Sequence, residues 1–361
     1  MVAAGAGGVP ALTAASAVRR VLAGGERRRP LIAEVKRNSL DDGPGIRTII
    51  FFKGCPLRCV WCHNPETKDP GPEIMRAEGE CLRCGACVEV CPSGATRWPG
   101  KGPPFSPFRG GGPPPHTRPD RLSTAPAGRP APPAPVRDPD LCLGCGRCVR
   151  ACPGRGVRLV GSYYDPEELA AMAALDLPFY RNSGGGVTLS GGEPTLYPRY
   201  VESLLLALEK RGVPVLLETS GYFAWDVFRR RLLPHLEAVY FDLKLTDPGA
   251  HHRYTGRDNR VILANLARLA RRGRDGEARP EVLARVPLVP GITATPANLE
   301  ATAGLLRRLG MERVALLPYN PLWLSKADGL GHRPTYRHAE WMSPDEIQRC
   351  REAFSGFELV D

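Results

Sequence analysis

Apolar runs and amphipathic stretches alternate along most of this chain. Short runs rich in β-branched and aromatic residues, typical of buried strands, lie near 46–52, 187–189, 213–217, 239–242, 282–288 and 314–317. Helical patterns lie near 198–211, 224–233, 260–271, 297–309 and 344–354. Asp165-Pro166 with Glu168 marks the start of another helix. This order predicts an α/β fold with a parallel sheet covered by helices, and six βα units indicate a partial (β/α)6 TIM-like barrel.

In such folds the chemistry sits on the loops that follow the strands. Candidate motifs fall at these places, namely a cysteine loop after 46–52, Gly191-Gly192-Glu193, Glu218-Thr219, Asp242 to Lys244 and Pro290-Gly291. We therefore expect one site along the carboxyl edge of the sheet.

Two segments interrupt the alternation. Residues 99–139 contain 20 Pro or Gly among 41 positions, which predicts a mobile linker, and residues 1–30 are predicted to be a disordered basic tail. These segments hold +8 of the net charge of +11, so the remainder is nearly balanced and nucleic-acid binding is not expected. We assign 31–78 and 157–361 to the barrel and 79–156 to an insert containing the linker.

The sequence also bears on the compartment. The arginines near the N-terminus follow the mildly apolar stretch, which is the wrong order for a secretory signal, and no apolar run reaches the ~18 residues of a membrane span. The cysteines favour iron–sulfur ligation over disulfides. We expect a cytoplasmic protein without a membrane partner.

Cys55, Cys59 and Cys62 form a C-x3-C-x2-C run. Three thiolates can hold three irons of a 4Fe-4S cube, which leaves one iron open to a substrate or cofactor. His63 adds a fourth ligand by count, but it follows Cys62 directly and cannot easily reach the same metal. A zinc site or plain structural cysteines remain the alternative for this motif.

Eight further cysteines form two C-x2-C-x2-C-x3-C-P runs, the spacing of bacterial two-cluster ferredoxins, in which the fourth cysteine ligates the other cluster. The expected ligand sets are Cys81, Cys84, Cys87 with Cys152, and Cys142, Cys145, Cys148 with Cys91. Gly85 and Gly146 lie where the backbone passes close to each cluster. Two zinc knuckles are the alternative. Cys350, in a helical pattern, is predicted to be a small buried apolar residue.

Several motifs together resemble the glycyl-radical-enzyme activating enzymes of the radical S-adenosylmethionine (SAM) superfamily. The similarity runs from about residue 35 to the C-terminus, apart from the linker. It is carried by SLDDGPGIRTIIFFKGCPLRCVWCHNPE (39–66), SGGGVTLSGGEP (183–194), LETSG (217–221), FDLK (241–244), HHRYTGRDN (251–259) and RVPLVPG (285–291).

The resemblance implies three 4Fe-4S clusters, with SAM bound at the open iron. One electron then cleaves SAM, and the 5′-deoxyadenosyl radical takes hydrogen from a glycine of a partner glycyl radical enzyme. It also implies a flavodoxin or ferredoxin as electron donor and a monomeric protein. The insert is expected either to relay electrons or to dock the partner, and the sequence does not choose between these roles.

The resemblance also assigns roles to single residues. It places cofactor contacts at Trp61, Gly191, Gly192, Glu193, Lys244, Arg285 and Asn298. It places a monovalent cation at Glu218, Thr219 and Asp242, although Asp is usual where this chain has Glu218. The loop Asp42, Gly43, Pro44 and Gly45 is expected to lie near the glycine-bearing peptide.

Three departures from the family pattern leave other functions open. Thr293 and Ala294 stand where Asn-Asp is usual, Asn320 stands at a histidine position, and the insert is lengthened by the linker. The alternatives are a radical SAM enzyme acting on a small molecule or peptide, a pure electron-transfer protein, and an inactive paralogue. The sequence does not identify the partner glycyl radical enzyme.

Overall fold

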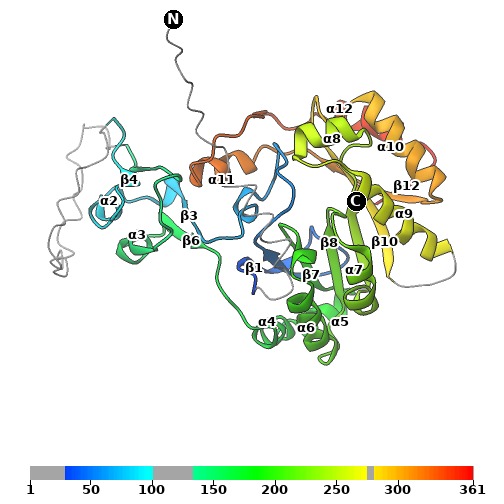
Figure 1. Cartoon of the computed structure of the whole chain (residues 1–361), viewed down its shortest axis with the longest axis horizontal. Helices are drawn as coiled ribbons and strands as arrows, with labels where there is room; N and C mark the ends of the chain where they lie inside the picture. The colour runs from blue at the N-terminus through cyan, green and yellow to red at the C-terminus, as the bar shows by residue number, and fades with distance from the viewer. Residues whose placement is uncertain (1–28, 101–132, 275–279, 361) are drawn as a thin grey trace, which may run out of the picture.

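A computed structural model describes residues 29–100, 133–274 and 280–360 (Figure 1). Almost all of the predicted tail and most of the predicted linker therefore lie outside the described residues. Among the described residues, no helix is both long enough and apolar enough to cross a membrane.

One eight-stranded sheet forms the body of the protein, in the order β1-β2-β7-β8-β9-β10-β11-β12. Its strands are β1 (Ile32–Ser39), β2 (Arg47–Phe52), β7 (Gly186–Gly191), β8 (Val215–Thr219), β9 (Ala238–Asp242), β10 (Glu281–Leu288), β11 (Arg313–Pro318) and β12 (Glu358–Val360). Neighbours from β2 onward are parallel, and β1 pairs antiparallel to β2. The predicted α/β fold with a mostly parallel sheet is confirmed.

Two strands of this sheet were not predicted. The strand β1 carries charged residues at alternate positions and is only half covered, so it lacks an apolar run. The strand β12 has three residues, too few to set a period. The described sheet therefore extends by one strand at each edge beyond the six predicted βα units.

Helices follow most of the strands. They are α4 (Pro166–Ala174), α5 (Leu177–Ser183), α6 (Pro198–Glu209), α7 (Trp225–Arg231), α8 (Pro248–Thr255), α9 (Arg260–Arg274), α10 (Pro296–Arg308), α11 (Trp323–Gly329) and α12 (Pro344–Glu352). The predicted helix start at Asp165 is confirmed, because Asp165 and Glu168 form a capping box. Cys350 of α12 is buried in the core of the body, as predicted.

The central strands are covered on both faces. All five residues of β8 are buried, as are the first five of β7, and the core around them is one continuous apolar cluster. This pattern fits a parallel sheet between layers of helix and loop. The carboxyl ends of the strands consequently meet along one edge, where the candidate motifs lie.

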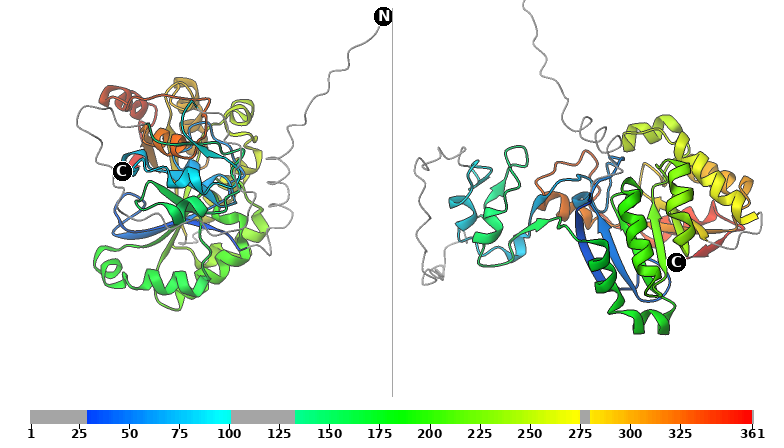
Figure 2. Two further views of the ribbon diagram at one scale, coloured as in Figure 1. Left: turned by 90° about the vertical axis from the view of Figure 1, so that its left-hand side faces the viewer. Right: turned by 60° about the horizontal axis from the view of Figure 1, so that its bottom comes forward.

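The cysteine-rich insert projects from the body (Figures 1 and 2). Its elements are β3 (Glu73–Arg76), α2 (Ala86–Glu89), β4 (Thr96–Arg97), β5 (Val136–Arg137), α3 (Arg147–Ala151) and β6 (Val157–Val160). The strand β3 pairs with β6, and β4 pairs with β5. The pair β3–β6 lies outside the predicted insert limits of 79–156, yet it belongs to neither edge of the large sheet.

Helix α11 joins the insert to the body. Leu330 packs with Met75 and Val160 in a small separate apolar cluster, and its carbonyl accepts a hydrogen bond from Arg137. A Cβ atom on Gly329 would lie 2.5 Å from the Arg76 carbonyl oxygen, so only glycine allows this approach. The insert is thus fixed by contacts on both of its halves.

Candidate functional site

The loop that carries Cys55, Cys59 and Cys62 leaves the carboxyl end of β2 and is held by backbone hydrogen bonds. The amide of Arg58 donates to the Thr255 carbonyl at 2.7 Å, and the amide of Val60 donates to the Tyr254 carbonyl at 3.1 Å. Both acceptors lie at the end of α8, within the HHRYTGRDN motif. This motif therefore supports the cysteine loop, which is a structural role that the sequence alone did not reveal.

The three cysteines of this loop are buried or half-buried, with Cys59 the buried one. Burial, followed by the charges of Cys59 and Cys62, raises the pKa of Cys55 far above its usual value. Burial also raises the pKa of Cys59 to about 11, although Lys244 and Lys68 act in the opposite direction. Such thiols ionise readily only when they bind a metal, which displaces the proton. Three neighbouring thiols on one loop, none of them fully exposed, fit a 4Fe-4S cluster.

A site for a single metal ion would differ from an iron–sulfur cluster, because its ligands must converge on one point. Among the described residues, no three or more His, Cys, Asp or Glu side chains converge closely enough to hold one ion. The cysteines of an iron–sulfur cube ligate separate irons, so their sulfur atoms need not converge on one point. The donor set is three thiols without a fourth protein ligand nearby in the sequence.

The Gly191-Gly192-Glu193 loop is bonded directly to the start of the cysteine loop. The amide of Gly192 donates to the Phe52 carbonyl and the amide of Glu193 to the Gly54 carbonyl, both at 2.8 Å. A Cβ atom on Gly192 would lie 2.2 Å from the Gly54 oxygen, so this position requires glycine. The two motifs form one surface at neighbouring strand ends.

The carboxylate of Glu193 is fully buried and is held by the chain itself. It accepts hydrogen bonds from the hydroxyls of Thr195, Thr219 and Ser220, and from the Ser220 amide at 2.8 Å. Its carboxylate therefore ties the loop after β7 to the loop after β8. Thr219, predicted to hold a cation, donates to this carboxylate.

A network of charges, of which Glu218 is buried and the others are partly buried, lies across β8, β9 and β10. Arg285 contacts the carboxylates of Glu218 and Asp242, and its Nε donates to Asp242 Oδ1 at 2.9 Å. Lys244 Nζ lies 3.1 Å from Asp242 Oδ2, and Ser190 donates to Glu218 at 2.5 Å. The two carboxylates predicted to hold a monovalent cation are thus paired with cations of the protein.

Burial and ion pairing shift the pKa values of these groups in different directions. Burial would raise the pKa of Asp242, but Arg285 and Lys244 lower it below its usual value. For Glu218, burial is the larger cause and its pKa is raised despite Arg285. Burial would lower the pKa of Lys244, but Asp242 raises it. Asp242 and Lys244 accordingly stay charged where the strand ends meet the cysteine loop. The charge of Lys244 lowers the pKa of Cys59, and the charge of Asp242 raises it.

Two further predicted contact residues support neighbouring loops. Asn298 accepts from the Thr246 amide at 3.1 Å and donates to the Thr293 carbonyl at 2.9 Å. Trp61 is buried in the main apolar core between two of the cysteines. Their described contacts are structural, and their roles toward a cofactor remain predictions.

The loop Asp42–Gly45 enters β2 and is held at its base by Arg47. The buried guanidinium of Arg47 donates to Thr188 Oγ1 at 2.7 Å and to the Pro44 carbonyl at 3.3 Å, and Thr188 donates to the Asp42 carbonyl at 2.8 Å. A Cβ atom on Gly45 would lie 2.5 Å from the Ser183 oxygen. Asp42 is also close enough to raise the pKa of Glu218, so this loop lies beside the charge network.

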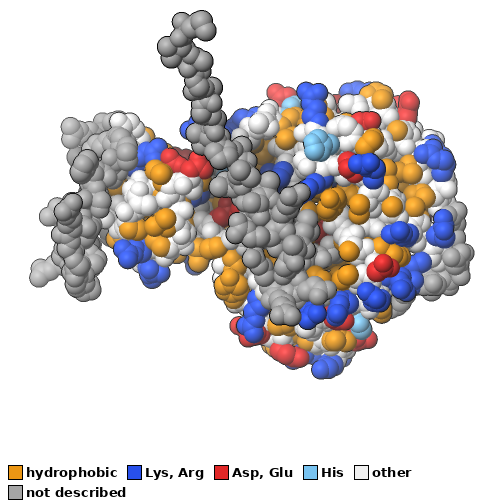
Figure 3. Space-filling model, viewed as in Figure 1, with side chains coloured by type: hydrophobic (Ala, Val, Ile, Leu, Met, Phe, Trp, Pro, Cys, Tyr) orange, Lys and Arg blue, Asp and Glu red, His pale blue; other side chains and the backbone are white. Residues whose placement is uncertain are grey.

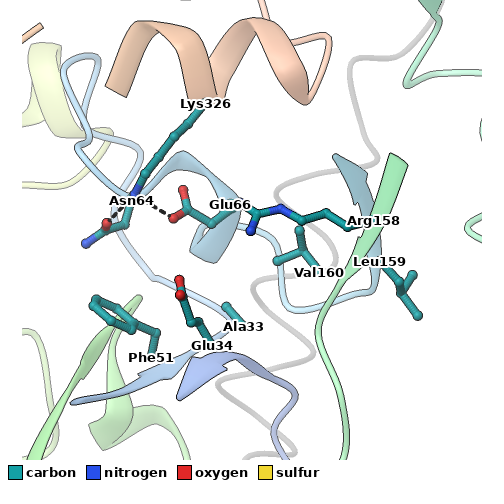
Figure 4. Close-up of a pocket in the computed structure, with 9 residues that line it drawn as sticks. All are labelled: Ala33, Glu34, Phe51, Asn64, Glu66, Arg158, Leu159, Val160 and Lys326. Carbon is teal, nitrogen blue, oxygen red and sulfur yellow. Dashed lines mark hydrogen bonds and ion pairs between the residues drawn. The ribbon is translucent and has the colours of Figure 1, made fainter. Parts of the chain in front are cut away.

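Lys326 of α11 was not predicted, and it clamps the segment that follows Cys62. Its Nζ lies 2.8 Å from Glu66 Oε1 and 3.1 Å from Asn64 Oδ1, and contacts the His63 carbonyl at 3.4 Å (Figure 4). These partners are about 260 positions away in the sequence, so no local pattern could have revealed the contact.

A pocket of about 120 Å³ lies beside this clamp, between the body and the insert (Figure 4). It is lined by Ala33, Glu34, Phe51, Asn64, Glu66, Arg158, Leu159, Val160 and Lys326. Glu66 is 8 % exposed, and its Oε2 has no hydrogen-bond partner among the described residues.

His63 is held neutral next to the cysteine loop. Burial, followed by the charge of Lys326, lowers its pKa to about 4. Its ring lies 5.8 Å from that of Tyr319, and its Nε2 is buried without a partner among the described residues. His63 is therefore an uncharged neighbour of Cys62.

The insert brings its two cysteine runs together. The charges of Cys142, Cys145 and Cys91 all raise the pKa of Cys148, with burial as the larger cause. These are the four residues expected to share one cluster, and the assignment of both sets remains a prediction. Cys87 and Cys148 are buried in the small core of the insert.

Three family models match parts of this chain. They are described as a 4Fe-4S dicluster domain over residues 80–156, a 4Fe-4S single cluster domain over 41–92, and the radical SAM superfamily over 143–303. The matched ranges cover the three-cysteine loop, the insert and much of the large sheet.

Several curated proteins are similar over most of their length. The isethionate sulfite-lyase activating enzyme of Nitratidesulfovibrio vulgaris is 34% identical over 81% of this chain and 84% of its own length. The choline trimethylamine-lyase activating enzyme of Oleidesulfovibrio alaskensis is 33% identical over 92% and 97%. The benzylsuccinate synthase activating enzyme of Thauera aromatica is 34% identical over 86% and 84%.

Proposed function

The chain belongs to the glycyl-radical-enzyme activating enzymes of the radical SAM superfamily, and from this premise we propose that it installs a radical on one glycine of a partner enzyme. When bound, the 4Fe-4S cluster and SAM supply one electron and a 5′-deoxyadenosyl radical that takes the glycine hydrogen. The protein supplies orientation, charge and exclusion of water.

One observation carries this proposal within the structure. Three cysteines, of which Cys59 is buried and Cys55 and Cys62 are half-buried, lie on one loop at the carboxyl end of β2, bonded to the glycine-rich loop after β7. The first loop supplies three ligands of a cube, and the second supplies close backbone approach beside it. An electron-transfer cluster ligated by four cysteines would need neither feature.

The charged residues at the strand ends are the proposed holders of the methionine part of SAM. Lys244 and Arg285 are cations whose side chains are only 11 % and 12 % exposed, while Asp242 and Glu218 are the facing carboxylates. The methionine end of SAM carries a carboxylate and an amine, so it presents both charges to this network. Because Asp242 already holds Lys244 and Arg285, these side chains are oriented before SAM binds.

The loop Asp42–Gly45 is the proposed contact for the glycine-bearing segment of the partner. Arg47 and Thr188 fix its backbone, and it lies close to the charge network. The insert is proposed to hold two further clusters, giving three in all, and to take electrons from a carrier protein. The partner remains unidentified beyond its class.

The test uses a purified glycyl radical enzyme as the candidate partner. The anaerobically reconstituted protein is reduced with dithionite and mixed with SAM and that enzyme. Electron paramagnetic resonance should then show a glycyl radical, and a partner whose radical glycine is replaced by alanine should show none. SAM cleavage without a glycyl radical on any partner would instead favour a radical SAM enzyme acting on a small molecule or peptide.

A further inference from the structure

The two cysteine runs of the insert are repeats that can be compared position by position. Cys81–Cys91 aligns with Cys142–Cys152 without a gap. In both runs a leucine follows the first cysteine, with Leu82 57 % and Leu143 71 % exposed, and the second cysteine of each run is exposed. Each predicted cluster therefore has an edge at the surface, with an apolar side chain beside it.

What differs between the repeats is charge. The position of Ala86 is taken by Arg147 in the second run, and the position of Glu89 is taken by Arg150. Helix α2 thus carries one acid and no base, whereas α3 carries two arginines and no acid. Cluster binding requires neither arginine, because the first repeat lacks both.

The exposed residues around Cys145 lie close together in the sequence. Leu141, Leu143, Arg147 and Arg150 are exposed, and all lie within ten positions. A Cβ atom on Gly146 would lie 3.5 Å from Nη1 of Arg150, so this guanidinium folds back beside the residue that follows Cys145. In Figure 3, apolar and cationic side chains lie together on the lower part of the insert, where Figure 1 labels α3.

The corresponding edge around Cys84 has the opposite balance. Glu78, Glu80 and Glu89 are exposed there, while Arg83 is half-buried. In residues 139–152 the one exposed acid is Asp140. The two cluster edges therefore present different charges to a visiting protein.

We propose that the surface formed by Leu141, Leu143, Cys145, Arg147 and Arg150 is the docking site for an acidic one-electron carrier protein. This inference rests on the proposed function, because it names where the electron for SAM cleavage enters. The reduced carrier loses one electron and the cluster held by Cys145 gains it, and no bond or proton is exchanged. Basic residues steer an acidic carrier, and the leucines exclude water at the contact.

The test reverses the charges on each edge in turn. The variant R147E/R150E is compared with E80R/E89R, which reverses the same number of charges beside the other run. Calorimetry measures the affinity of each holoprotein for an acidic flavodoxin, and stopped-flow absorbance measures the rate at which reduced flavodoxin bleaches the clusters. We expect at least about a tenfold loss of both at low salt for R147E/R150E, with little salt dependence remaining, and no loss for E80R/E89R.

Dithionite needs no docking surface, so it separates this proposal from the enzyme's function. Dithionite-driven formation of 5′-deoxyadenosine should be equal in both variants and the wild type. If R147E/R150E fails to assemble its clusters, R147Q/R150Q takes its place, with an expected several-fold loss. Equal losses in both variants, no loss in either, or a loss of glycyl radical enzyme binding in place of carrier binding would overturn the proposal.

Discussion

The loop after β2 and the two runs of the insert all carry cysteines in iron–sulfur spacing, but their surroundings differ. Cys59 is 8 % exposed and lies among loops from three further segments of the body. Cys84 and Cys145 are exposed at the surface of the insert. Cys87 and Cys148 of the same runs are as buried as Cys59, so what separates the regions is that each run has one fully exposed cysteine and the loop after β2 has none.

The two regions also differ in what holds them together. The body has a continuous core of strand and helix side chains. The buried core of the insert consists of Ile74, Cys87, Cys148 and Val157, so half of it is cysteine. We therefore predict that the body folds without metal, while the fold of the insert depends on bound iron.

Removal of iron is the strongest way to test this difference. Anaerobic chelation of all iron should unfold the insert and leave the large sheet folded, because half of the small buried core of the insert is cysteine. The hydrogen-exchange rate of the backbone amides in β3, β6, α2 and α3 should rise to that of an unfolded chain. Protection in β8 and β9 should persist, and loss of protection throughout the chain would contradict the account.

Within the body, the charge network should be the most sensitive point. Arg285→Ala leaves Glu218 and Asp242 without their shared cation, so the free energy of unfolding should fall by about 3–5 kcal/mol. Urea unfolding of the metal-free protein measures this free energy. Arg285→Lys keeps the charge but cannot contact both carboxylates in the same way, and it should fall between wild type and alanine. An unchanged stability in Arg285→Ala would show that the network is not coupled.

Low pH should lower the stability of the body through Asp176, whose carboxylate contacts one residue of β1 and one of β2. Arg37 and Thr48 donate to its buried carboxylate, and the Arg37 hydrogen bond is the main cause of its lowered pKa. A lowered folded-state pKa gives stability that is present above the unfolded value of about 3.9 and is lost as pH falls through the folded value.

Asp176→Asn should therefore cost about 2 kcal/mol at neutral pH and flatten the pH dependence of unfolding in that acid range. Denaturant titrations from neutral to acid pH measure both effects. A variant with the same acid sensitivity as the wild type would assign that sensitivity to other carboxylates.

The smallest expected effect compares one glycine in each region. Gly144 of the insert and Gly184 of the body both have φ near +70°, and neither has an atom closer than 3.4 Å to an added Cβ. Each alanine substitution should cost about 1 kcal/mol from backbone strain alone. Gly184→Ala should lower global stability, whereas Gly144→Ala should increase only local opening of the insert by hydrogen exchange. Equal global losses would mean that the two regions unfold together.

The sequence was most informative where the signal is local. Strands such as β8 are continuous apolar runs, and the cysteine spacings are complete within a few residues, so both could be predicted. The strand β1 could not, because its charged face meets solvent. Lys326 and Asp176 could not be predicted either, since their partners lie more than 100 positions away.

The site shows the same limit. The place of Glu193 and Lys244 after predicted strands made them candidates, and the family resemblance added Arg285 and a role for each, whereas the structure shows what each contacts. Glu193 binds the loop after β8, and Arg285 joins two carboxylates from neighbouring strands. These contacts form across the sheet, and no periodicity along one strand encodes them.

The central claim is that the three-cysteine loop after β2, and not the two runs of the insert, performs SAM cleavage. The most direct measurement quantifies 5′-deoxyadenosine and methionine formed anaerobically with dithionite and SAM by the wild type, Cys59→Ala and Cys84→Ala, with iron content measured for each. The account predicts no product from Cys59→Ala and product at the wild-type level from Cys84→Ala. Product from Cys59→Ala, or none from a wild type shown to hold its clusters, would contradict it.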